Sequence, residues 1–203
     1  PTTLRNNYGS VALARYPDGR LPVTRYGLED FAVTGGLRWE NEALGNFDLA
    51  LNYGNDRLDS TDRDAINPSW GNASPSTIYT GRREADQTNL TLDWTRDFAN
   101  DWLFKPLTVS AGLAWRQENY DLSAGDAAGW SNGPLFNTLD PVTGRRLPGY
   151  YSGITQVDAV SLDRRVIGAY LDVEAQITEK FQAGVAVRSE HYSDFGDTTN
   201  GKL

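Results

Sequence analysis

Apolar and polar residues alternate with a period of two along most of this sequence, and no other feature limits its possible folds as strongly. The clearest segments are residues 28–40, 47–58, 86–98, 107–120, 165–177 and 181–192, with a weaker one at 8–15. Successive side chains of a strand point to opposite faces, so this alternation predicts strands with one apolar side. We therefore expect an all-β chain, an antiparallel up-and-down meander of about seven strands.

The two faces of these strands differ sharply in composition. One face carries large apolar residues such as Phe31, Leu49, Leu92 and Leu171. Between the flanking loops the other face has no Val, Ile, Leu, Phe or Trp. Its charged residues include Arg38, Asp48, Asp93, Asp172, Glu174 and Arg188. If the sheet closes into a barrel, these charges line the lumen as ion pairs, and Arg38, Asp93, Glu174 and Arg188 are candidates for plug docking or ligand passage.

Short and long connections alternate between the strands. Short turns are expected at 41–46, 99–106 and 178–180, and long polar segments at about 59–85 and 121–164. Long loops of this kind are uncommon inside a compact soluble domain, whereas outer-membrane barrels have short turns on one side and long loops on the other. Aromatic residues gather near both ends of the strands, as in a chain crossing two membrane–water interfaces. The pattern therefore favours a transmembrane β-barrel.

A soluble alternative accounts for the same alternation. In an all-β carbohydrate-binding module, the apolar faces would pack against each other in a closed two-layer core, and loop aromatics would bind the sugar. This alternative predicts that Leu49, Leu92, Val109 and Leu171 are sealed together inside one monomer.

Composition excludes several function classes. The chain has 19 Lys and Arg against 27 Asp and Glu, a net charge of −8, so nucleic acid is not an expected partner. It has no Cys and one His, which excludes thiol chemistry and multi-histidine metal sites. There is no Met, even at position 1, so we expect an internal or processed segment of a longer protein. The sequence has no run of about 18 apolar residues, so no transmembrane helix is predicted. The strands of a β-barrel cross a membrane without such a run.

Several stretches resemble TonB-dependent outer-membrane receptors. The sharpest resemblance is Arg188-Ser-Glu-His-Tyr-Ser-Asp-Phe-Gly196 with the following 199–203 and the preceding hairpin segment 165–180. Segments 16–22, 34–38 and 72–76 also resemble this family. The resemblance covers nearly all of residues 1–203, although the loops match only in character.

Membership in this family implies a 22-strand barrel in the bacterial outer membrane, filled by an N-terminal plug. It implies binding and TonB-energised uptake of a scarce ligand, such as a siderophore, oligosaccharide, cobalamin or peptide. The plug, the TonB box and the closing strand have no counterpart in the sequence, so the chain is interpreted as a middle segment of the barrel. The implied partners are the TonB complex, reached through the plug, outer-membrane lipid and a small ligand.

Aromatic residues in the long connections are the candidate ligand contacts. These are Trp70, Tyr79, Trp130, Tyr150 and Tyr151, with Arg145 as a candidate for an anionic ligand. Such side chains stack on sugars or aromatic ligands, but packing of one loop against the next is an equally expected role.

Catalysis, metals and cofactors are not expected. His191 lies near Glu190 and Asp194, but there is no strained Gly-x-Ser-x-Gly turn for a nucleophile, so a hydrolase is the weakest hypothesis. The acidic segment 55–64 lacks the spacing of a calcium loop. Alone in water, the segment would expose apolar surface over six strands, so we expect it to require neighbouring strands, detergent or self-association through that face.

Overall fold

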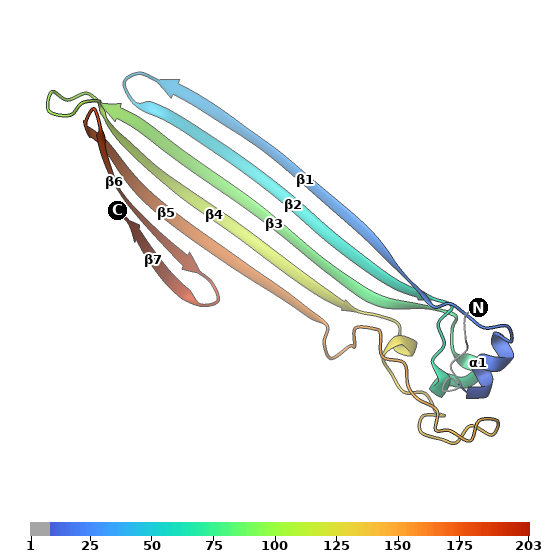
Figure 1. Cartoon of the computed structure of the whole chain (residues 1–203). Helices are drawn as coiled ribbons and strands as arrows, with labels where there is room; N and C mark the ends of the chain where they lie inside the picture. The colour runs from blue at the N-terminus through green and yellow to red at the C-terminus, as the bar shows by residue number, and fades with distance from the viewer. Residues whose placement is uncertain (1–8) are drawn as a thin grey trace. The chain divides into compact units, whose positions relative to one another are not determined.

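A computed structural model describes residues 9–203, which form one seven-stranded antiparallel sheet in the order β1-β2-β3-β4-β5-β6-β7 (Figure 1). The strands are β1 Val23–Asn41, β2 Gly45–Arg63, β3 Thr77–Phe98, β4 Leu107–Ala124, β5 Val160–Thr178, β6 Phe181–Tyr192 and β7 Gly196–Lys202. Each strand pairs with the next in sequence, so the predicted all-β, up-and-down meander is confirmed.

The strands at the two ends of the sheet differ from the prediction. The expected strand at 8–15 is wrong for its described part, because Gly9–Arg15 forms helix α1, while residue 8 lies outside the described residues. Its Val-Ala-Leu-Ala core consists largely of good helix formers, and Ala12 is buried. The seventh strand is instead β7, which pairs with β6 from Tyr192↔Gly196 to Ala186↔Lys202. Its sequence GDTTNGK has no apolar residue, so alternation gave no signal.

The long connections are shorter than predicted. Strand β2 continues to Arg63 and β3 begins at Thr77, while β4 ends at Ala124 and β5 begins at Val160. The intervening residues are therefore 64–76 and 125–159, which contain the short helices η2 Pro68–Ala73 and η3 Ala127–Gly129. The added strand residues are mostly polar, so their backbone pairing leaves no alternation of apolar residues in the sequence.

The described chain divides into two compact units, and strands run through both. The first contains residues 9–30, Asp56–Ala85 and Tyr120–Ser161, including α1 and both long connections. Its core consists of Ala65, Ile78 and Ala128, against which Trp70 and Tyr150 pack. The second contains Phe31–Asn55, Asp86–Asn119 and Leu162–Leu203.

The second unit is a sheet whose apolar side is exposed. Leu49, Leu92 and Leu171 are 39%, 40% and 46% exposed, and Val109 is half-buried. In the β5–β6 pair, Leu171 opposes Val187 and Val173 opposes Val185, so apolar residues of neighbouring strands share a face. Within residues 9–203, no second layer of strands covers this face. A separate finding is that none of the helices in this range is long and apolar enough to cross a membrane.

Candidate functional site

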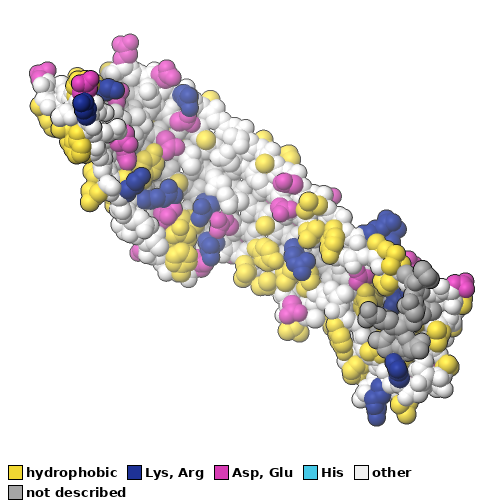
Figure 2. Space-filling view, viewed as in Figure 1, with side chains coloured by type: hydrophobic (Ala, Val, Ile, Leu, Met, Phe, Trp, Pro, Cys, Tyr) yellow, Lys and Arg dark blue, Asp and Glu magenta, His cyan; other side chains and the backbone are white. Residues whose placement is uncertain are grey.

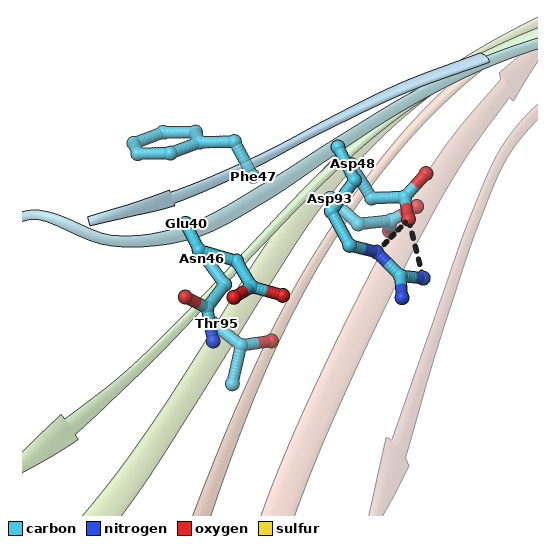
Figure 3. Close-up of a pocket in the computed structure, with 7 residues that line it drawn as sticks. Glu40, Asn46, Phe47, Asp48, Asp93 and Thr95 are labelled. Atoms are coloured by element: carbon cyan, nitrogen blue, oxygen red, sulfur yellow. Dashed lines mark hydrogen bonds and ion pairs between the residues drawn. The ribbon is translucent and has the colours of Figure 1, made fainter. Parts of the chain in front are cut away.

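The polar face of the second unit is the side of the sheet that carries Arg38, Asp93, Glu174 and Arg188. Near the β1–β2 turn, Arg38 Nε and Nη2 donate to Asp48 Oδ2 at 3.0 and 2.8 Å. This pair lies in a hollow that Glu40, Asn46, Asp93 and Thr95 also line (Figure 3). The Phe47 ring points to the other side of the sheet in the same view. Neighbouring residues of β2 therefore separate into a charged and an apolar side, as alternation predicted.

A glycine lets the polar face of the second unit bridge three strands. The Tyr170 hydroxyl of β5 donates to Asp93 Oδ1 of β3 at 2.7 Å, across Gly112 of β4. A Cβ on Gly112 would collide with the Tyr170 ring and lie 2.6 Å from Asp93 Oδ1. The absence of a side chain at this position thus permits the hydrogen bond.

The two other predicted lumen residues lie at the β5–β6 side of the polar face. Arg188 Nη2 donates to Glu190 Oε1 at 2.7 Å, an i,i+2 pair on one strand. Glu174 lines a hollow of about 490 Å³ together with Tyr170, Asp172 and Arg188. Figure 2 shows acidic and basic side chains interspersed on the visible surface of the sheet. Of the predicted lumen set, the structure ties Arg38, Asp93 and Arg188 to partners on this face.

The first unit is held together by buried carboxylates rather than by ion pairs alone. Asp62, at the end of β2, accepts hydrogen bonds from the hydroxyls of Thr24, Tyr150 and Ser152 at 2.7, 2.6 and 2.7 Å. Burial, together with the hydrogen bond to Asp62, raises the pKa of Tyr150 to about 12. The connection 125–159 is thereby fixed to the end of strand β2.

A second carboxylate joins helix α1 to the same connection. Asp140 Oδ2 accepts from the backbone nitrogen and hydroxyl of Ser10 at 2.8 and 2.6 Å. Its other oxygen accepts from the Val142 nitrogen and from the nitrogen and hydroxyl of Thr143. Burial alone would raise the pKa of Asp140, but these hydrogen bonds outweigh it and hold the pKa below its ordinary value.

Most of the candidate ligand aromatics pack within the first unit. Trp70 Nε1 donates to the Ser131 carbonyl and Trp130 Nε1 to the Gly125 carbonyl, at 3.2 and 3.0 Å. The Tyr79 hydroxyl donates to Asp59 at 2.6 Å, and Tyr150 is held by Asp62. These four side chains are half-buried, and their polar atoms bind neighbouring groups of the first unit.

The remaining two ligand candidates are exposed. Tyr151 is 66% exposed, and its hydroxyl donates to Asn132 Oδ1 at 2.6 Å. Arg145 is also exposed, on the connection 125–159. Tyr151 and Arg145 therefore remain accessible to solvent on this connection.

His191 does not contact the carboxylates near it in sequence. Its Nδ1 lies 2.6 Å from Asp197 Oδ1, directly opposite on β7, whereas Glu190 binds Arg188 and Asp194 binds Arg164. No group of three or more His, Cys, Asp or Glu able to hold a metal occurs among residues 9–203. The imidazole therefore belongs to an exposed cross-strand pair of the β6–β7 hairpin.

Several residues that organise the two units were not singled out from the sequence. Asn67 is fully buried, and its Nδ2 donates to the carbonyls of Ala128 and Ser131 at 2.8 and 3.0 Å. Asp140 and the role of Gly112 were missed as well, and the prediction that Asp62 lies in a solvated acidic loop is wrong, because Asp62 is buried at the end of β2. The Asn-Pro step at 67–68 is a helix-start signal, because Asn67 caps η2 through Ser69. The other contacts join residues far apart in sequence, which no local pattern indicates.

No protein-family model, no curated protein and no solved structure shows a significant match to this chain.

Proposed function

We propose that this chain is part of the barrel wall of a TonB-dependent outer-membrane receptor, which binds a scarce ligand and takes it up without bond-making chemistry. Energy would reach it from the TonB complex through a plug domain. The ligand class stays open among ferric siderophores, oligosaccharides, cobalamin and small peptides. The resemblance of residues 165–203 and of the upstream segments to this family provides the specific assignment.

One observation carries the proposal: large apolar side chains are exposed on one side of the strands, while several charged side chains on the other side bind one another or a neighbouring hydroxyl. Leu37, Leu113 and Ile167 are exposed, whereas Arg38 holds Asp48 and Tyr170 holds Asp93. Contact of a continuous apolar surface with water is unfavourable, whereas the acyl chains of a membrane would solvate this surface. The paired charges suit a lumen that contains water or a plug.

The open sheet supports a larger barrel. Strands β1 and β7 have one neighbour each, so their outer edges have unpaired backbone groups among residues 9–203. Within lipid such edges are very costly, and barrel closure removes them. The single layer of strands also favours a barrel wall over the two-layer core of a carbohydrate-binding module.

The first test locates the full-length protein that contains this sequence. Cells are fractionated, and the outer membrane is extracted with detergent. We expect the protein in the detergent-soluble outer-membrane fraction. Its recovery in the soluble fraction of the cells would overturn the proposal.

A second test examines the orientation of the strands. Val142, in the connection 125–159, and Asp101, in the β3–β4 turn, are both exposed and are each replaced by Cys. Residues 1–203 have no cysteine, and any cysteine elsewhere in the full-length protein is replaced by Ser before labelling. A membrane-impermeant maleimide added to intact cells should label Val142→Cys and should label Asp101→Cys only after lysis. Equal labelling of both positions before lysis would contradict a membrane-spanning arrangement.

A further inference from the structure

A basic hollow lies in the first unit between the long-connection ends of β1, β2 and β3. Val23, Arg25, Arg63, Asp64, Ser76 and Thr77 line this hollow, which has a volume of about 370 Å³. Arg25 and Arg63 are exposed, and neither has a carboxylate partner among the described residues. By contrast, Arg57 and Arg82 of the same unit both bind Asp59. The hollow therefore has two guanidinium groups available for an external anion.

The side of the sheet on which the hollow opens follows from the alternation of side chains. Thr24 and Asp62 are joined by a 2.7 Å hydrogen bond, and Asp62 also binds Tyr150 and Ser152 of the connection 125–159. Adjacent residues of a strand point to opposite faces. Arg25 and Arg63 therefore point away from the side that this connection occupies.

The same alternation relates the arginines to the apolar residues of their strands. Along β1, Arg25 is an even number of residues from Phe31, and along β2, Arg63 is an even number from Tyr53. Phe31 and Tyr53 are in contact, with ring centroids 6.4 Å apart. Between the aromatic pair and these arginines, the same side carries Arg57, which pairs with Glu29 and Asp59. Arg25 and Arg63 thus lie beyond a charge-balanced stretch, and in a membrane aromatic and then charged residues match the passage from acyl chains to headgroups.

The chemistry of the hollow suits a phosphate group. Guanidinium groups bind phosphate oxygens through paired hydrogen bonds, and the hydroxyls of Ser76 and Thr77 add donors. Asp64 is the one acidic residue of the lining, and its backbone carbonyl accepts a hydrogen bond from the Arg20 guanidinium. The nearby arginines outnumber the Asp64 carboxylate, so the local charge remains positive.

We propose that this hollow binds the phosphate of an anionic lipid headgroup in the outer leaflet, with Arg25 and Arg63 as the binding residues. The inference rests on the proposed receptor function, because the lipid reaches the hollow only if the strands cross the outer membrane. Bound lipid would fix the height of the strands in the bilayer and cover this part of the sheet.

The test uses the full-length protein purified from outer membranes in a non-ionic detergent. Native mass spectrometry measures the phosphorus-containing lipid that remains bound to each protein molecule. We expect the double variant Arg25→Gln/Arg63→Gln to retain less lipid than the unmodified protein, by a factor of about ten or more. The reason is that two charge-assisted contacts are removed. Arg25→Lys/Arg63→Lys, which keeps the charge and loses the paired geometry, should give an intermediate value.

The matched control is Arg83→Gln/Arg146→Gln, which removes the same charge from exposed arginines outside the hollow. It should retain as much lipid as the unmodified protein. Equal lipid loss in the control, or unchanged lipid in Arg25→Gln/Arg63→Gln, would overturn the proposal. Circular dichroism of each variant confirms that the strands are intact.

A second arm separates lipid from soluble phosphate. Inorganic phosphate is titrated into delipidated protein, with anionic lipid in detergent as the competing ligand. We expect the lipid to bind and inorganic phosphate not to displace it. If phosphate alone occupies the hollow and lipid does not bind, the lipid assignment is wrong. If the protein is outer-membrane in location but its lipid is insensitive to these variants, this inference fails while the receptor proposal stands.

Discussion

The carboxylate of Asp62 accepts a 2.6 Å hydrogen bond from the hydroxyl of Tyr150, a residue 88 positions later in the chain. Ser152 donates to the same oxygen at 2.7 Å, and Thr24 donates to the other. A single side chain at the end of β2 thus holds both the neighbouring strand and a long connection. The connection 125–159 is therefore fixed on both sides of Tyr151, whose own side chain is exposed.

Replacing Tyr150 by Phe should loosen the connection 125–159 without unfolding the sheet. The change leaves Asp62 with two hydroxyl donors and removes a hydrogen bond of a buried carboxylate, at a cost of about 1–3 kcal/mol. Limited proteolysis should then cut within 125–159 faster. Tyr151→Phe, which removes an exposed hydroxyl contact, is the matched control and should change the rate little. Identical rates for the two variants would contradict the anchoring role of Asp62.

Helix α1 should stay docked across the neutral range and detach only in acid. Hydrogen bonds from Ser10 and Thr143 hold the pKa of Asp140 below its ordinary value of 3.8. A depressed pKa contributes stability that is complete above the ordinary value and is lost as the pH falls through the folded pKa. The protection of residues 9–15 against hydrogen exchange, relative to the intrinsic exchange rate at each pH, should therefore fall only below about pH 4.

The corresponding control is Asp140→Asn. This variant lacks the ionisable group, so exchange in α1 should already be faster at neutral pH and should lose the acid-dependent step. If Asp140→Asn showed an acid transition of unchanged size, the transition would have to come from another titratable group.

Gly112→Ala should disrupt the bridge between Tyr170 and Asp93. The added Cβ would meet the Tyr170 ring and the Asp93 carboxylate, and overpacking of this kind costs about 1–3 kcal/mol. Gly184→Ala is the matched control, because its Cβ would have its nearest neighbours at 3.5 Å, an ordinary contact. Thermal unfolding in detergent should show a lower midpoint for Gly112→Ala alone. Equal midpoints for the two variants would mean that the Tyr170–Asp93 contact does not require the glycine.

A charge placed on the apolar side should have opposite consequences in lipid and in water. Leu49→Arg at a lipid-facing position near the midplane costs about 2–4 kcal/mol and should reduce the amount of folded protein in the outer membrane. Ala50→Arg, its neighbour on the polar face, should assemble nearly normally. Leu49 is 39% exposed, so a soluble protein would tolerate the Arg. Normal membrane assembly of Leu49→Arg would contradict contact with acyl chains.

The sequence predicted those parts of the fold in which side chains alternate. Strand β6 was predicted at 181–192 and is found at Phe181–Tyr192, because its apolar residues mark every second position. Strand β7 was missed because pairing of its polar residues depends on backbone hydrogen bonds to β6, and these leave no mark on composition. Helix α1 was misassigned because a run of four apolar residues, Val-Ala-Leu-Ala, is too short to separate the two periods.

The candidate site was predictable in kind but not in contacts. The pairing of Arg38 with Asp48 follows from opposite charges beside a short turn. By contrast, the roles of Trp70 and Trp130 depend on carbonyl groups of the connection 125–159, whose course no local pattern specifies. The partner of Asp140 is Ser10, 130 residues away, so only the folded chain brings them together.

The two hydrogen bonds from Asn67 to Ala128 and Ser131 also join parts of the chain that are synthesised at different times. Ile78 shares its core with Ala65 and Ala128, so a nascent chain that has grown only as far as β3 can form this core only in part. During synthesis, part of this core therefore stays exposed to solvent until residues some fifty positions later have been made.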